Sequence, residues 1–135
     1  MIQRIQTIWL ILAAVCGFTT LKTAFYIGSI GTEPANNLTA MSNLWLMILT
    51  IAIATIATVS IFLFKNRSLQ LKLVLLTIAL SIVVLILYFF ETQKYTVGGF
   101  ALTSILAMAI PVFLVLSAIG IYKDEKLIKS VDRLR

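Results

Sequence analysis

Histidine is absent from this 135-residue chain, and cysteine occurs only once, at Cys16. Zinc clusters and histidine-ligated haem or copper need several such ligands, so a single copy of the chain cannot build one. An intramolecular disulfide framework is excluded for the same reason. Cys16 lies in an apolar run between Val15 and Gly17, where a small side chain packing between helices is the expected role. We therefore expect no metal and no cofactor.

Charged side chains are also scarce, because they make up 12% of the residues, where soluble domains carry about 25%. Hydrophobic residues make up 61% of the chain. A helix of about 20 apolar residues crosses the roughly 30 Å hydrocarbon core of a bilayer. The charges lie near the ends of four runs long enough for this, which indicates a membrane protein: Ile5–Leu21, Pro34–Phe64, Leu73–Phe90 and Tyr95–Tyr122.

The predicted fold is all-α, with four transmembrane helices in a single integral membrane domain over residues 1–135. The expected helices cover about 5–30, 44–64, 71–90 and 99–122, and a tail follows over 123–135. Lys22, inside the first helix, is expected to snorkel to the interface. That helix ends at no convincing signal-peptide cleavage site, so we expect it to be retained. Short connections, predicted as turns, favour an up-down antiparallel bundle, and Pro111 is expected to kink the fourth helix.

Lysine and arginine are distributed unevenly between the two ends of this predicted bundle. Lys22 and Lys94 fall on one side, and nine basic residues fall on the other. Because short cytoplasmic segments of membrane proteins are enriched in basic residues, both termini are predicted to be cytoplasmic. The nine are Arg4, Lys65, Arg67, Lys72, Lys123, Lys126, Lys129, Arg133 and Arg135.

Small residues recur at helical spacing along the predicted helices. Such stripes let helix backbones approach closely and let hydroxyl groups bond across the interface. A polar pathway lined by serine and threonine is the alternative interpretation. The candidate packing residues are Gly17, Ala54, Thr58, Gly99, Thr103, Ala107 and Pro111.

The predicted membrane interior holds no Asp, Glu, His or Arg. Proton relays and ion-coupled transporters place such groups there, so we do not expect this chain to transport ions alone. Enzymes need an activated nucleophile or a metal. We therefore predict a noncatalytic protein, because its carboxylates all lie in loops or the tail: Glu33, Glu91, Asp124, Glu125 and Asp132.

The tail from Tyr122 to Arg135 is the most distinctive soluble segment. It is predicted to form a short amphipathic helix, with Leu127, Ile128, Val131 and Leu134 on one face. Such a helix suits either the anionic surface of the inner leaflet or a protein partner, and both interpretations stay open. The candidate contact residues for partner or lipid are Lys123, Lys126, Leu127, Lys129, Val131, Arg133, Leu134 and Arg135.

Both ends of the chain resemble those of a known family. The opening MIQRIQTIWL and the closing KDEKLIKSVDRLR are similar to an uncharacterised, Bacteroidota-type family of four-helix integral membrane proteins, one of unknown function. The resemblance implies a multi-pass protein of the inner, cytoplasmic membrane of a didermic bacterium. It transfers no catalytic or binding residue to this sequence.

These observations lead to three hypotheses about function. The leading one is a noncatalytic accessory subunit that docks on a larger inner-membrane complex, concerned with protein export or insertion, respiration or envelope biogenesis. The second is a carrier or sensor of a lipid or other hydrophobic molecule, which would occupy a cavity opened by the Pro111 kink. The third is an oligomeric channel. The expected partners are membrane lipids and a larger membrane complex, and no direct contact with nucleic acid is expected.

Overall fold

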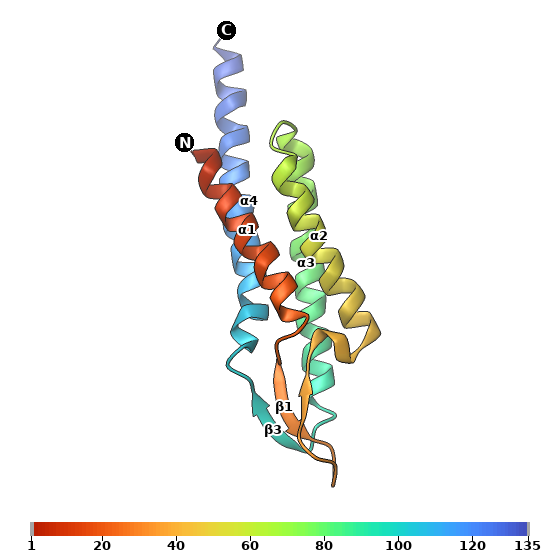
Figure 1. Ribbon diagram of the computed structural model, residues 1–135. Helices are drawn as coiled ribbons and strands as arrows, with labels where there is room; N and C mark the ends of the chain where they lie inside the picture. The colour runs from red at the N-terminus through yellow and green to blue at the C-terminus, as the bar shows by residue number, and fades with distance from the viewer. Residues whose placement is uncertain (1, 135) are drawn as a thin grey trace.

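The computed structural model describes residues 2–134, with side chains from Ile5 to Leu134. Figure 1 shows four long helices and a small β-sheet at one end of them. The helices are α1 (Ile2–Thr20), α2 (Leu44–Phe62), α3 (Arg67–Thr92) and α4 (Ser104–Arg133), and a short 3-10 helix, η1, covers Ala40–Ser42. The strands are β1 (Tyr26–Ser29), β2 (Asn36–Leu38) and β3 (Val97–Phe100).

The helices form an up-down bundle in which each helix packs against its neighbours in sequence. α4 closes the bundle by packing against α1. The first residues of α1, the α2–α3 turn and the last turns of α4 lie together at what we call the terminal end, and the sheet lies at the opposite end (Figure 1). The four helices and their antiparallel order agree with the sequence-based prediction, which did not include the sheet.

Three helices, α2, α3 and α4, are long and apolar enough to cross a membrane, and α1 is a shorter apolar helix. Large apolar side chains such as Leu76, Phe62 and Phe90 are exposed on the outside of the bundle. Lipid accommodates such side chains, whereas water does not. At 1.5 Å per residue, α4 is about 45 Å long, which exceeds the roughly 30 Å hydrocarbon core by about 15 Å.

The first helix is shorter than expected, since the prediction of a helix over about 5–30 is wrong beyond Thr20. The Thr20 hydroxyl donates to the Gly17 carbonyl at 2.8 Å, and Lys22 follows in an exposed turn. The chain then enters the sheet, where the backbone N–H of Phe25 donates to the Leu38 carbonyl at 2.7 Å. Lys22 therefore lies outside α1, in the turn that leads toward β1.

The sheet end holds a three-stranded antiparallel sheet of order β2–β1–β3. β2 lies in a connection predicted as a turn, whereas β1 lies within the predicted first helix and β3 extends into the predicted fourth. Tyr26 pairs with Leu38 of β2 on one side and with Phe100 of β3 on the other. Gly28 pairs with Gly98 across the β1–β3 interface. β1 therefore joins two connections that lie far apart in the sequence.

The Gly28–Gly98 pair requires glycine at both positions because the backbones approach closely. A Cβ atom at Gly98 would lie 2.6 Å from the Gly28 Cα and 2.6 Å from the Ile27 carbonyl oxygen, and one at Gly28 would lie 2.6 Å from the Val97 carbonyl oxygen. A Cβ at the adjacent Gly99 would meet nothing within 4 Å. Of the two consecutive glycines in β3, only Gly98 is therefore required by the close approach of the two strands.

Aromatic rings attach the sheet to the bundle. The Phe25 ring stacks on Tyr88 of α3 with ring centroids 4.2 Å apart, and Tyr88 is almost completely buried. Phe100 meets the rings of both Phe25 and Tyr26 edge-on. These contacts supply a small aromatic core between the sheet and the helices.

The fourth helix begins later and ends later than predicted. Gly99, expected at its start, lies in β3, and Thr103 precedes its first residue, Ser104. The Thr103 hydroxyl donates to the Ala24 carbonyl, which fixes this junction against the chain after α1. The helix includes Pro111 and continues to Arg133, so the tail is part of α4 and not a separate short helix.

Candidate interaction surface

The last turns of α4 extend beyond the rest of the bundle at the terminal end (Figure 1). Every residue from Lys126 to Leu134 is exposed, whereas Asp124 just before them is 5% exposed. Because the helix runs to Arg133 without interruption, this segment keeps the direction of the span that precedes it. We call residues 125–134 the α4 projection.

The α4 projection carries four exposed apolar side chains. Leu127, Val131 and Leu134 follow one another at i, i+4 and i+7 on one face, and Leu134 is 89% exposed. Ile128 lies toward the α2–α3 turn, where it lines a hollow of ≈ 560 Å³ together with Phe64. Exposed apolar side chains that gather in one place typically mark an interaction site.

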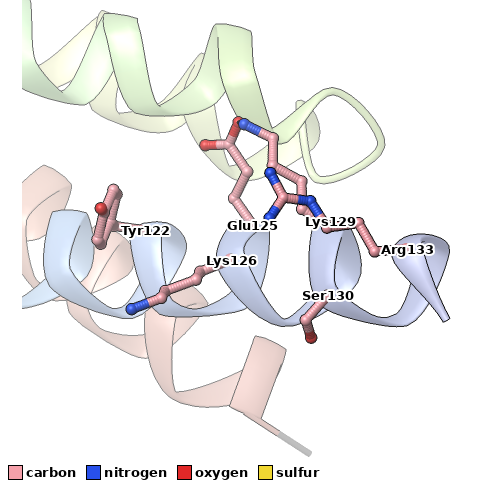
Figure 2. A pocket seen from close by; sticks show the side chains of 6 residues that line it. All are labelled: Tyr122, Glu125, Lys126, Lys129, Ser130 and Arg133. Carbon is pink, nitrogen blue, oxygen red and sulfur yellow. The ribbon is translucent and has the colours of Figure 1, made fainter.

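Charged side chains occupy the flanks of the projection (Figure 2). Lys129 Nζ donates to Glu125 Oε1 at 3.0 Å, whereas the side chains of Lys126 and Ser130 lie away from this ion pair in Figure 2. A further hollow of ≈ 310 Å³ runs along this part of the helix, lined by Tyr122, Glu125, Lys126, Lys129, Ser130 and Arg133. Arg135, a predicted contact residue, lies outside the described residues.

The base of the projection is held by a buried polar contact between α1 and α4. Gln6 Nε2 donates to Asp124 Oδ2 at 2.6 Å, and both side chains are at most 6% exposed. Gly120, one turn earlier, leaves room for this contact, since a Cβ there would lie 2.7 Å from Gln6 Cγ. Arg67 Nη1 approaches the Asp124 carbonyl oxygen at 3.5 Å from the start of α3.

Sequence reasoning missed this contact, because Gln6 and Asp124 are separated by 118 positions. Asp124 was considered only as a carboxylate of the tail, and Gln6 only as part of the opening segment. The available signal was that each is a polar side chain at the edge of an apolar run. No pattern along the chain indicated that the two would meet.

A second polar contact ties the α2–α3 hairpin together at the same end. Gln70 Nε2 donates to the Ser60 carbonyl at 2.8 Å, and both residues are buried. Arg67 lies between two hollows, one of ≈ 570 Å³ that also borders Gln6 and Gln70, and the ≈ 560 Å³ hollow beside the α4 projection. The terminal end is therefore rich in polar and basic groups.

At the sheet end, Glu91 is engaged in local contacts. Its Oε1 atom accepts from Asn43 Nδ2 at 2.7 Å and from Lys94 Nζ at 3.0 Å. Burial of the nearby Tyr95, and then the negative charge of Glu91, raise the pKa of the Tyr95 hydroxyl. Glu91 thus orders the end of α3 and the start of α2.

The candidate packing residues have different surroundings. Gly17 lies against Ala54, because a Cβ at Gly17 would be 3.1 Å from the Ala54 Cβ. Ala107 is buried in α4 and Pro111 is half-buried. Gly99 and Thr103 lie outside the helices, as described above.

The hydroxyl groups of the helices bond mainly within their own helix. The Thr58 hydroxyl donates to the Ala54 carbonyl at 2.8 Å, and the Thr77 hydroxyl donates to the Leu73 carbonyl at 2.7 Å. Such back-bonding satisfies a hydroxyl in an apolar setting without a partner from another helix. The expected hydroxyl bonds across the interface are therefore not made by these two threonines.

The remaining carboxylates do not form a cluster. Glu33 is exposed in the connection between β1 and β2, whereas Asp132 is exposed near the end of α4. Within residues 5–134, no group of three or more His, Cys, Asp or Glu side chains is placed to hold a metal ion.

Four apolar helices, three of them long and apolar enough to span a bilayer, indicate the class of helical membrane proteins. A small sheet lies at one end of the helices and the α4 projection at the other. The chain matches the family model of a domain of unknown function, DUF4293, over residues 2–134, and it belongs to that family. This agrees with the resemblance seen at the two ends of the sequence, whereas the Bacteroidota origin stays a prediction. No curated protein and no solved structure matches the chain.

Proposed function

We propose that this protein is a noncatalytic accessory subunit of a larger complex in the bacterial inner membrane, and that it docks through the α4 projection. The observation that carries the proposal is the set of exposed apolar side chains on a helix that extends past the bundle. The complex would serve protein export or insertion, respiration or envelope biogenesis.

The distribution of basic residues supports an orientation with the terminal end in the cytoplasm. Lys65, Arg67 and the lysines of the α4 projection lie at the terminal end, whereas Lys22 and Lys94 lie near the sheet. Basic residues next to membrane spans remain preferentially in the cytoplasm. The sheet would then face the periplasm, and the α4 projection would be available to cytoplasmic parts of a partner.

The direction of α4 favours a protein partner over the membrane surface. An amphipathic helix that binds lipid headgroups lies in the plane of the interface. The α4 projection instead continues its span without a break, from Ser104 to Arg133. The exposed face at Leu127, Val131 and Leu134 would thus point into water unless another protein covers it.

The base of the projection supports a docking role because it limits the freedom of the helix before binding. The Gln6–Asp124 hydrogen bond and the approach of Arg67 hold the last buried turn of α4 against α1 and α3. A surface that is already ordered loses less conformational entropy when it binds.

The proposal is tested by affinity purification of the tagged protein from its native membrane in a mild detergent, followed by mass spectrometry. The variant L127Q/V131Q/L134Q removes the exposed apolar face of the projection. The matched control, V97Q/L102Q, changes exposed apolar side chains near the sheet, of which Leu102 is 86% exposed.

We expect the natural protein and the control to retain a stoichiometric large membrane partner, and the triple variant to lose it. Retention of that partner by the triple variant would contradict the docking surface. Purification of the natural protein with lipid alone would favour the carrier hypothesis, and purification as a homo-oligomer would favour the channel.

A further inference from the structure

An apolar groove runs between α3 and α4 on the outside of the bundle. It encloses ≈ 640 Å³, and its walls include Leu75 and Ile78 of α3 and Val115 and Ile119 of α4. Toward the terminal end the groove is bordered by Tyr122, Lys123 and Lys126. A site of this size lies within the range of sites that hold small molecules.

The two ends of the groove differ in chemistry. The part between Ile78 and Ile119 is apolar and belongs to the segments long and apolar enough to lie within a bilayer. The lysines lie about one to two helical turns farther along α4 than Ile119, or about 6–10 Å at 1.5 Å per residue. The two lysines therefore lie just beyond the apolar part of the groove. A phospholipid has the same arrangement, because its charged headgroup lies just beyond its acyl chains.

The positive charges at the groove are not compensated within the described part of the chain. Neither Lys123 nor Lys126 has a carboxylate within ion-pair distance among residues 5–134, whereas Lys129 is paired with Glu125. Asp124, the carboxylate next to Lys123 in sequence, is buried against Gln6. The groove thus presents two ammonium groups without a carboxylate partner and, beside them, the exposed side chain of Tyr122.

We propose that this groove binds one anionic phospholipid, with an acyl chain along α3 and α4 and the phosphate on Lys123 and Lys126. Basic pockets between transmembrane helices near the membrane surface recognise anionic headgroups. The apolar walls and the charged border are both needed, because lysines alone attract any anion and an apolar groove alone accepts any lipid tail. The headgroup end of this site adjoins the apolar face that we assign to the protein partner, because Lys123 and Lys126 also line a hollow of ≈ 370 Å³ with Leu127. The acyl-chain part of the groove lies farther from that face, between Ile78 and Ile119.

The site is tested with the purified full-length protein by native mass spectrometry and by thermal unfolding during titration with phosphatidylglycerol or phosphatidylcholine. The variants are K123Q/K126Q, which removes the charge, and I119W, which fills the groove without changing either lysine. K129Q is the matched control, since it removes one positive charge from the same helix at a position away from the groove.

We expect phosphatidylglycerol to bind and stabilise the natural protein and K129Q more than phosphatidylcholine does. Near a membrane surface each lysine contributes about fivefold in affinity, so K123Q/K126Q should bind phosphatidylglycerol roughly 30-fold more weakly. I119W should also lose the bound lipid. The substituted lysines are all exposed, so the charge variants test binding without disturbing the core.

Three results would overturn the proposal. Equal binding by K123Q/K126Q and the natural protein would exclude the lysines as headgroup ligands. An unchanged affinity in I119W would show that the lysines attract anionic lipid without use of the groove. A protein helix found in the groove, with no lipid bound, would assign the surface to a partner. None of these results depends on whether the α4 projection docks on a complex.

Discussion

Asp124 is a buried carboxylate at the point where α4 leaves the bundle, and Gln6 is its hydrogen-bond donor. Hydrogen bonds to charged groups contribute about 1.5–3 kcal/mol, and a buried donor left without a partner costs about 1–3 kcal/mol. The pair therefore links the stability of the α1–α4 interface to the position of the α4 projection.

We expect D124A to lower the free energy of unfolding by about 1–3 kcal/mol, because the Gln6 amide loses its acceptor. D124N should lose less than D124A because it keeps an acceptor oxygen for Gln6. It should still lose some stability, because a neutral hydrogen bond is roughly half as strong as a charged one. Thermal unfolding in detergent measures both. D132A, an exposed carboxylate on the same helix, is the control, and equal losses in D124A and D132A would contradict the assigned role.

The consecutive glycines of β3 allow a second comparison at single residues. We expect G98A to destabilise the β1–β3 pairing by about 1–3 kcal/mol, because its Cβ would clash with Gly28 and Ile27. G99A should stay within about 0.5 kcal/mol of the natural protein, since its Cβ meets nothing. Protease susceptibility of the sheet and thermal unfolding distinguish the two. A larger loss in G99A than in G98A would contradict the close approach of the β1 and β3 backbones at Gly28 and Gly98.

Among the elements, α2 and α3 could be predicted from the sequence and β1 could not. α2 starts at Leu44 as expected, and α3 differs from the prediction by a few residues at each end, because long apolar runs bounded by polar residues define a membrane helix. The sequence predicts that the residues of β1 continue the first helix. They form a strand instead because they pair with β2 and β3, and this pairing cannot be seen in the local sequence. The same pairing takes Gly99 out of the fourth helix.

The candidate surface could also be predicted only in part, because some of its features are local in the sequence and others depend on tertiary contacts. The periodicity of Leu127, Val131 and Leu134 along one helix indicates an amphipathic face from local sequence alone. The contact of Gln6 with Asp124 and the groove between α3 and α4 depend on which helices are neighbours, which a single sequence does not specify.

The α1–α2 interface provides a prediction at the scale of elements. In the natural background, G17A should destabilise the protein, because its Cβ would lie 3.1 Å from the Ala54 Cβ. In the A54G background that obstacle is absent, and alanine should stabilise α1 by up to about 1 kcal/mol over glycine. A double-mutant cycle of thermal stabilities should therefore give a coupling of at least about 0.5 kcal/mol. Additive effects would show that the two helices do not meet at these residues.

At the scale of the whole molecule, the two ends differ in charge and structure. The sheet end is held together by aromatic contacts and by the hydrogen bonds of Glu91, whereas the terminal end carries the α4 projection and most of the basic residues. In the proposed function, the projecting helix is the place at which the bundle binds another protein. The groove beside α3 would hold an anionic lipid at the same end.

The most direct test of the docking role is photo-crosslinking in living cells from a reactive side chain placed at Val131. Leu102, which is also highly exposed but lies next to the sheet, is the control position. We predict that Val131 forms an adduct with one large subunit of a membrane complex and that Leu102 does not. Adducts from Val131 with lipid alone, or none at all in intact cells, would contradict the account.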